Sequence, residues 1–489
     1  MTGLIYPARA AAALALAGAL AAGSSVHAQG TLDRNRPPTP AAPPVLRVPA
    51  WTTSRLHNGA RLVVVEKHDL PLIACNIDFV GGATSYEPAG KEGLAGFAAQ
   101  MLSEGTPTRT ADQLSDAQQL LGTSISAQVG PETGTIRFTS LSDKFEPALA
   151  LLADMMLNST FPDSSLERIR GRALVVLAQA RDQPNTIAAN VFSRVTYGDA
   201  HPYGRIASPQ SVQQVRRGDV MQFAATYFRP GRAVITVSGD ITPAAARAVV
   251  EKVLGAWPVG GAPPAFTYPA APAARSTTIY LVDKPKAAQS VFALGEPGPA
   301  RDTPDYYSIQ VMNTLLGGLF QSRLNHDIRE VKGFSYGVGS NFAFGRGPGP
   351  FKAGGDIVSA KTDSALMAFI THFRGVRGEM PFTDDEVKQG KESLIQSLPS
   401  RFATVNGTAA AISSIYVQDL PSTFYTTYAA RINAVTRHDL TRVASKYIDL
   451  QHMNLVIVGD RATIEGPLKA TGIAPVQILD VDGKPAVIP

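Results

Sequence analysis

The sequence predicts an α+β protein made of two homologous domains, each an antiparallel sheet with helices packed on one face. A Pro- and Ala-rich stretch, VGGAPPAFTYPAAPAAR at residues 259–275, divides the chain into two halves. Each half opens with two β-like runs and closes with another that ends in Gly-Asp, and these pairs, Gly239-Asp240 and Gly459-Asp460, lie 220 positions apart. A repeat of that length with the same order of elements indicates two copies of one domain.

The first half alternates between strand and helix patterns. Strands are predicted at ARLVVVEK (60–67), PLIACNIDFV (71–80), TGTIRFTSL (133–141) and RAVITVSGD (232–240). Helices are predicted at TADQLSDAQQLLG (110–122), at DSSLERIRGRALVVLAQAR (163–181) and in a segment ending near Trp257. Thr110 and Gln113 form a capping box at the start of the first of these helices.

The second half repeats this order. Strands are predicted at TTIYLVDK (277–284), QSVFALG (289–295) and MNLVIVGD (453–460). Helices are predicted at TDDEVKQGKESLIQSL (383–398) and DLTRVASKYI (439–448), because apolar residues recur there at helical spacing.

The N-terminus has the pattern of a secretory signal peptide. Arg9 precedes an apolar run from Ala10 to Ala22, and Val26-His27-Ala28 fits a cleavage site. An uncleaved anchor is the alternative, but the run falls short of the roughly 20 residues that span a bilayer, and no other run reaches that length. We therefore expect a signal peptide at residues 1–28, a Pro-rich leader at 29–50, and a periplasmic or secreted protein without a transmembrane segment.

Composition excludes some classes of function. The formal net charge is only +5 over 489 residues, and no Lys/Arg run is interleaved with aromatic residues, so nucleic-acid binding has no support. Cys75 is the single cysteine of the chain. An internal disulfide is therefore impossible, and Cys75 is expected to be buried as a small apolar side chain.

The stretch GLAGFAAQMLSEGT, residues 93–106, is a predicted helix with two unlike faces. Its apolar stripe consists of Leu94, Phe97, Ala98, Met101 and Leu102. The opposite face carries Gly96, Ala99 and Gln100, which are small or uncharged. A plain core helix is one interpretation of this pattern.

The same stretch resembles the insulinase/pitrilysin-type zinc metallopeptidases, in which it has the form G-L-A-H-x-x-E-H-M-L-F-x-G-T with the inverted zinc motif. Gly96 and Gln100 stand where that family has its zinc-binding histidines, and Ala99 stands where it has the glutamate base. A later segment, ERIRGRALVVLAQARDQP, has Val175 and Val176 where the family has an acidic pair that includes the third ligand. The resemblance therefore implies no zinc in this chain and no peptidase activity of the chain alone.

The second half resembles the family in another motif. SRLNHDIREVKGFSYGVGS, residues 322–340, fits the C-terminal pattern S-R-L-x-x-x-(L/I)-R-x-x-x-G-(L/F)-x-Y-x-V-x-S, with Arg329 and Tyr336 at the positions of its Arg and Tyr. In the family this pair faces the zinc site and binds the substrate backbone, so the resemblance implies that Arg329 and Tyr336 bind substrate. The alternative is a surface Arg in an ordinary ion pair and a Tyr that packs.

A competing motif lies within the same segment. GFSYG, residues 333–337, matches the G-x-S-x-G pattern of serine hydrolases with Ser335 as nucleophile. That pattern requires a strand before the serine and a helix after it, whereas here the expected order is reversed. His372, His438 and His452 could supply a base, but nothing near them in the sequence marks a triad.

The resemblance covers about residues 51–480 and implies domains of the mitochondrial-processing-peptidase type, which form two half-shells around a chamber. It implies an N-terminal peptidase-like domain with a degenerate zinc motif at 51–258, a linker at 259–275, and a C-terminal domain with the Arg/Tyr pair at 276–489. The predicted function is a non-catalytic substrate-binding subunit of a heteromeric, exported zinc metallopeptidase that degrades or processes peptides. Its partner would be a homologous subunit that carries the zinc. The alternative is a catalytically inactive scaffold or binding module that keeps only the fold.

Overall fold

The computed structural model describes residues 46–82, 85–260, 266–272 and 276–486. The predicted signal peptide (1–28) and nearly all of the leader (29–50) lie outside the described residues. Across the described part, no helix is both long and apolar enough to cross a bilayer.

The described residues form two six-stranded sheets. The first has the order β1-β2-β6-β3-β5-β4 and the second the order β12-β7-β11-β8-β10-β9. The strands of the first are β1 (Thr52–Arg55), β2 (Arg61–Glu66), β3 (Leu72–Val80), β4 (Ser126–Val129), β5 (Thr133–Leu141) and β6 (Ala233–Gly239). Those of the second are β7 (Thr278–Asp283), β8 (Gln289–Pro297), β9 (Ser335–Phe342), β10 (Pro350–Val358), β11 (Asn454–Gly459) and β12 (Val476–Leu479).

The two sheets share one topology apart from their outermost strands. β2, β6, β3, β5 and β4 correspond in order to β7, β11, β8, β10 and β9, and the strands β6 and β11 end on the two predicted Gly-Asp pairs. Gly239 has a φ of +146°, and a Cβ there would overlap the carbonyl oxygen of Leu72. The α+β class and the duplication are therefore confirmed.

The sheets are mixed, where the sequence analysis predicts antiparallel ones. β6 runs parallel to β2 but antiparallel to β3, and β11 runs parallel to β7 but antiparallel to β8. β6 and β11 are inner strands, and each follows a long segment of helices in the sequence. The alternation of apolar residues predicts a strand but carries no information on its direction.

Helices separate the paired strands in each half. In the first half they are α2 (Leu94–Met101), α3 (Ala111–Leu120), α4 (Phe145–Leu157), α5 (Asp163–Ala180), α6 (Pro184–Tyr197), α7 (Pro209–Gln214), α8 (Arg217–Tyr227) and α9 (Pro243–Leu254). In the second half they are α10 (Tyr306–Asn313), α11 (Arg323–Asn325), α12 (Thr362–Arg374), α13 (Asp384–Gln396), α14 (Val405–Val417), α15 (Phe424–Ala434), α16 (Arg437–Tyr447) and α17 (Arg461–Ala470). The capping box at Thr110 is present, as predicted, and the structure shows a second one at Thr383.

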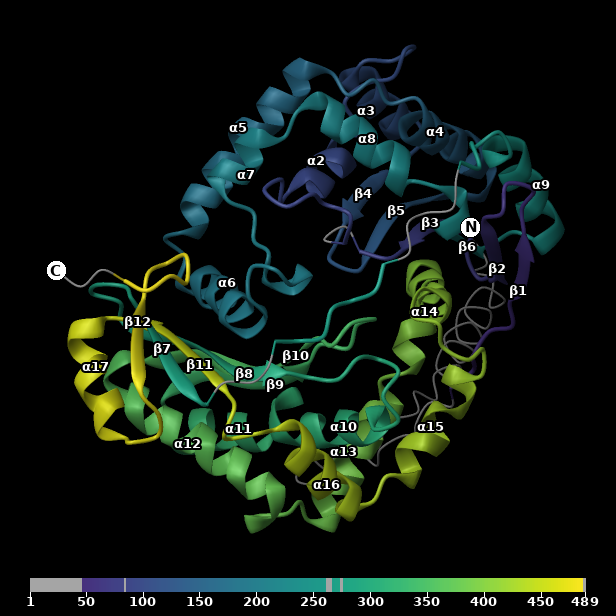
Figure 1. The fold of residues 1–489 in the computed structure, drawn as a ribbon. Helices are drawn as coiled ribbons and strands as arrows, with labels where there is room; N and C mark the ends of the chain where they lie inside the picture. Colours follow the sequence, from purple (N-terminus) through teal and green to yellow (C-terminus); the bar gives the residue numbers. More distant parts are fainter. Residues whose placement is uncertain (1–45, 83–84, 261–265, 273–275, 487–489) are drawn as a thin grey trace, which may run out of the picture. The chain divides into compact units, whose positions relative to one another are not determined.

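One face of each sheet packs on helices of its own half, as predicted. The other face receives a helix from the other half, which the sequence does not predict. α6 packs against β8 and β11 of the second sheet, and α14 packs against β3 and β6 of the first (Figure 1). α6 begins at Pro184 and α14 at Val405, about one repeat later, so each is the counterpart of the other.

Candidate functional site

The helix α2 forms as predicted and buries its apolar stripe. Leu94, Phe97 and Met101 are each at most 3% exposed. On the opposite face, the Cα of Gly96 borders open space, Ala99 is buried and Gln100 is exposed. The position at which the family has its first zinc-binding histidine therefore has room for a side chain but lacks one.

The N-terminus of α2 is held by a carboxylate that the sequence analysis did not identify. Glu87 accepts hydrogen bonds from the backbone N–H groups of Gly93 (3.2 Å) and Ala95 (2.7 Å). Burial raises the pKa of Glu87, and these two bonds offset only part of that effect. Glu87 precedes the helix by several residues, so no capping pattern in the sequence could have shown it.

The helix α5 contains the second family motif, in which Arg170 packs against neighbouring segments but the acidic pair is absent. Arg170 lies beside Glu167 on the same helix, and its guanidinium donates to the carbonyl oxygens of Val212 and Val215, so it fixes α5 to the chain around α7. Val175 and Val176 are 56% and 61% exposed. These two side chains contribute no ligand and little packing.

The residues at the family's zinc positions do not fit a zinc ion. Zinc sites are built from imidazole, thiolate or carboxylate ligands. Gly96, Ala99, Val175 and Val176 have no lone pair on their side chains, and the amide of Gln100 is a poor substitute. Over the described ranges, no three His, Cys, Asp or Glu side chains gather as a metal-binding group.

Arg329 lies in η6 (His326–Val331), a π-helical segment that continues α11. Its guanidinium carbon lies 4.5 Å from the ring centroid of Phe320, and its Nε lies 3.0 Å from the carboxylate of the neighbouring Glu330. The Phe320 ring is itself 61% exposed. Arg329 is therefore held over an aromatic face at the surface, and π-helical segments are frequent at functional sites.

Tyr336 is the second residue of β9, an edge strand of the second sheet. It is 87% exposed, and its hydroxyl has no hydrogen-bond partner among the described residues. The pairing of β9 with β10 shifts register next to Tyr336, between Gly355 and Ile357. Such a β-bulge changes the direction in which a side chain points.

The segments that carry Arg329 and Tyr336 are tied together by one buried side chain. Asn325 donates from its amide nitrogen to the carbonyl oxygen of Phe320 (2.6 Å), and its amide oxygen accepts from the N–H of Val338 (3.1 Å). One residue thus links the loop of Phe320 to β9. The structure shows no direct contact between the Arg329 and Tyr336 side chains. Phe320 and Asn325 were missed in the sequence because neither contact follows from spacing.

The serine-hydrolase alternative does not fit the geometry. Ser335 follows a helical segment and begins a strand, which is the reverse of a nucleophile elbow. Its hydroxyl donates to the carbonyl oxygens of Gly337 (3.0 Å) and Asp356 (2.7 Å), so it fixes the bulge. His372 pairs with Asp327, and His452 with Asp449.

Comparison with protein-family models decides the relationship. Residues 63–209 match the model described as Insulinase (Peptidase family M16), and residues 214–394 match the one described as Peptidase M16 inactive domain. The chain belongs to the peptidase M16 family. Both sequence motifs quoted above lie within the matched segments of this M16 protein.

Related proteins agree with this assignment. The chain is 26% identical over 282 residues, 58% of its length and 67% of the other's, to the uncharacterized zinc protease YmxG of Bacillus subtilis. It is 23% identical over 411 residues, 83% of its length and 93% of the other's, to the non-peptidase homolog YmxG of Helicobacter pylori. A crystal structure of a peptidase M16 inactive domain from Pseudomonas fluorescens superposes with a TM-score of 0.77 and 25% identity, covering 84% of this chain and 98% of the other. The name of the Helicobacter relative fits a catalytically inactive member of the family.

Proposed function

We propose that this M16 protein is an exported, non-catalytic subunit of a zinc peptidase, which binds the peptide substrate and supplies Arg329 and Tyr336 to the active site of a zinc-bearing homologous subunit. The observation that carries the proposal is the contrast between the two halves. The first half lacks every metal-binding group of its motif, whereas the second half presents hydrogen-bond donors at the surface.

The chemistry of these donors suits a peptide. The Arg329 guanidinium and the Tyr336 hydroxyl can donate to a peptide carbonyl and more strongly to the oxyanion that forms during hydrolysis. The ion pair of Arg329 with Glu330 joins two partly exposed side chains and so contributes little stability. The guanidinium can therefore exchange this contact for one to a substrate while the Phe320 ring still holds it.

Support for an M16 partner comes from the family itself. A chain without zinc can take part in hydrolysis only if another chain brings the metal, and relatives such as the Bacillus protein are named zinc proteases. Support for export is the signal-peptide pattern of residues 1–28. The N-terminal sequence of the mature protein, recovered from the producing cell, tests this part directly.

Steady-state kinetics of a mixture test the proposed role of the pair. The purified chain is combined with a zinc-bearing M16 relative from the same genome, and hydrolysis of a peptide library is measured. We expect Arg329→Ala and Tyr336→Phe each to lower kcat/KM of the mixture by about 10-fold or more, as removal of one oxyanion donor does elsewhere. Arg437→Ala removes an exposed guanidinium of α16 and serves as the matched control.

The pattern of results separates this role from that of a scaffold. A scaffold that keeps only the fold has no need of either donor, so unchanged kcat/KM in both variants would refute the proposed role of the pair. A stable complex with unchanged kinetics would then favour the scaffold. Binding of each variant to the partner is measured alongside, because a lost complex would otherwise imitate a lost donor.

A further inference from the structure

A second candidate site lies at the start of β6, and neither Arg329 nor Tyr336 lines it. It is a cavity of about 430 Å³ lined by residues of both halves. Four of them are arginines: Arg55, Arg61, Arg232 and Arg346. One exposed carboxylate, Asp419, also lines it. The formal charge of the lining is therefore strongly positive.

Arg232 is the most unusual of these residues. Arg232 is only 7% exposed. All three of its guanidinium nitrogens are buried without a hydrogen-bond partner among the described residues. The guanidinium carbon lies 4.3 Å from the ring centroid of Tyr86 and 5.7 Å from that of Tyr227. The two rings contact the guanidinium, but its N–H groups donate no hydrogen bond to a described residue. A buried cation without an acceptor is costly, and an anion in the cavity would remove that cost.

The guanidinium groups of the other three arginines also form no ion pair with a carboxylate in the described part of the chain, although the backbone N–H of Arg346 donates to Glu132 (2.7 Å). Arg55 donates to the carbonyl oxygen of Gly59 (3.0 Å), and Arg346 to that of Val417 (2.6 Å). Arg61 lies over the Tyr416 ring, with its guanidinium carbon 4.8 Å from the centroid. Each guanidinium has five N–H donors, so all three keep donors for a ligand.

Aromatic side chains form another part of the wall. Tyr86, Phe266, Tyr268 and Tyr416 line the same cavity, and the Phe266 and Tyr268 rings are in edge contact with centroids 4.9 Å apart. Aromatic side chains beside a few convergent charged groups are a combination found in small-ligand sites. The rings suit an apolar body, while the arginines suit an oxyanion attached to it.

We propose that this cavity binds an organic anion, a carboxylate or phosphate carried on an apolar or aromatic group, with Arg232 as its innermost donor. The guanidinium fork binds such oxyanions in two parallel hydrogen bonds. The site does not depend on the zinc-bearing partner, because every residue named here belongs to this chain.

Thermal unfolding and calorimetric titration of the purified chain test the site with a matched pair of probes. N-acetylphenylalanine and its amide share one body and differ in the carboxylate, and inorganic phosphate is an oxyanion without the body. At constant ionic strength, we expect millimolar N-acetylphenylalanine to raise Tm by about 2 °C or more, since a ligand that binds the folded state stabilises it. We expect no shift with the amide and a weaker one with phosphate.

Variants locate the effect. Arg232→Met is expected to abolish the response to N-acetylphenylalanine, and the double variant Arg61→Gln/Arg346→Gln to weaken binding at least about 10-fold. The double variant decides the matter if Arg232→Met does not fold, because Arg61 and Arg346 are not buried. Arg374→Gln, at an exposed position on α12, is the control and should respond as the unmodified chain does.

Several outcomes would overturn the proposal. Equal shifts with the acid and the amide would show that the charge is not recognised. A response to phosphate alone would exclude the apolar component. Responses that persist in both the Arg232 and the double variant would place the bound anion elsewhere.

Discussion

At the scale of single residues, the function that we propose for this M16 protein rests on the side chains missing from α2 and on Tyr336, which is exposed on β9. The family pattern identified Gly96, Ala99 and Gln100 as the positions of the zinc ligands and the glutamate base, because these positions have a fixed spacing within one helix. The structure adds that a Cβ on Gly96 would have no neighbouring atom within 4 Å among the described residues, so none of these residues takes the place of the missing side chain.

The first residue-scale prediction concerns metal content. Because the side chains at the family's zinc positions offer no imidazole or carboxylate, we expect less than about 0.1 zinc per chain after purification in the presence of zinc. Elemental analysis of the purified protein measures this, with a zinc-bearing M16 relative as the positive control. Stoichiometric zinc that a chelator removes slowly would contradict our interpretation of α2.

A second residue-scale prediction concerns Glu296 on β8, which is 8% exposed and accepts the backbone N–H of Asp449 at 2.5 Å. Burial, with a contribution from the charge of Asp449, raises the pKa of Glu296 from 4.5 to about 8. The folded state therefore holds a proton that the unfolded state has lost, and the free energy of unfolding falls as the pH rises from about 4.5 to 8. This dependence should disappear in Glu296→Gln, which keeps an acceptor for the Asp449 N–H.

Urea unfolding at pH 5 and pH 9 tests this assignment. We expect Glu296→Gln to differ little from the unmodified chain at pH 5 and to be more stable at pH 9, by about 2–4 kcal/mol. A variant that is less stable than the unmodified chain at both pH values would show that Glu296 is charged and paired in the folded protein.

Other important residues could not be predicted from the sequence. Glu87, Phe320 and Asn325 each act through a contact to a backbone group or side chain whose position depends on the fold. Arg232 received no role from the sequence beyond its place at the start of a predicted strand, and only the packing of Tyr86 and Tyr227 around it shows that it is buried. Residue spacing within one element could be read from the sequence, whereas contacts between elements could not be predicted from it.

At the scale of elements, the helices and strands that local signals predicted are present, but others, such as α4 and α14, were not predicted. The capping box at Thr110 placed one helix start correctly, because its reciprocal hydrogen bonds involve only residues three apart. Strand direction was not predictable, nor were the π-helical segments such as η6. Both depend on how an element meets its neighbours.

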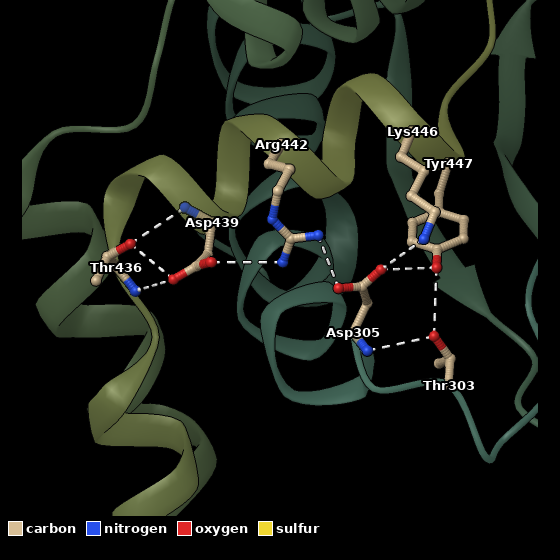
Figure 2. A network of polar contacts seen from close by, with 7 residues as sticks. All are labelled: Thr303, Asp305, Thr436, Asp439, Arg442, Lys446 and Tyr447. Atoms are coloured by element: carbon tan, nitrogen blue, oxygen red, sulfur yellow. Dashed lines mark hydrogen bonds and ion pairs between the residues drawn. The ribbon is translucent and has the colours of Figure 1, made fainter.

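An ion-pair network joins α10 to α16 (Figure 2). Asp305 accepts from Arg442 (2.7 Å), Lys446 (2.9 Å) and the hydroxyl of Tyr447 (2.8 Å). Burial alone would raise the pKa of Asp305, but the three donors outweigh it and lower the pKa to about 2. The charged form of Asp305 therefore stabilises the contact between the two helices.

Asp305→Asn tests this contribution. We expect it to lower the free energy of unfolding by about 2 kcal/mol at pH 7, since the amide loses the charge that the three donors share. A depressed pKa gives stability that is fully present above the unfolded value of 3.8 and is lost as the pH falls towards 2. The difference between variant and unmodified chain should accordingly shrink in acid.

Asp384→Asn is the control for this measurement. Asp384 also pairs with an arginine, Arg437, but its side chain is 85% exposed. Its loss should change the free energy of unfolding by less than about 0.5 kcal/mol. Equal effects of the two substitutions would show that burial of Asp305 adds nothing to the network.

At the scale of the whole molecule, the duplication was predictable and the exchange of helices was not. The two Gly-Asp pairs, each at the end of a corresponding strand, indicated the repeat, and the matching strand orders of the two sheets confirm it. The apolar stripe of a helix shows that it is buried but not which sheet covers it. That α6 lies on the second sheet and α14 on the first follows only from the structure. The domain boundaries at 51–258, 259–275 and 276–489 remain predictions.

This exchange predicts that the halves stay together after the chain is cut. The face of the second sheet under α6 is apolar, with Tyr280, Val282, Val291 and Val456 buried there. With a protease site inserted at residues 266–272, the cut halves should elute as one species on size exclusion in native buffer. Residues 276–489 expressed alone should aggregate or bind a hydrophobic dye, because α6 is missing. Two separate, folded monomers after cleavage would contradict the packing described here.

Titration tests whether a chain without zinc takes part in peptide hydrolysis. A zinc-bearing M16 relative is held at fixed concentration while this chain is added, and the initial rate of peptide hydrolysis is followed. We expect no hydrolysis by this chain alone and a rate that rises with its concentration to a plateau near one chain per zinc subunit. A rate that does not change on addition, or hydrolysis by this chain in the absence of the relative, would contradict the proposed function.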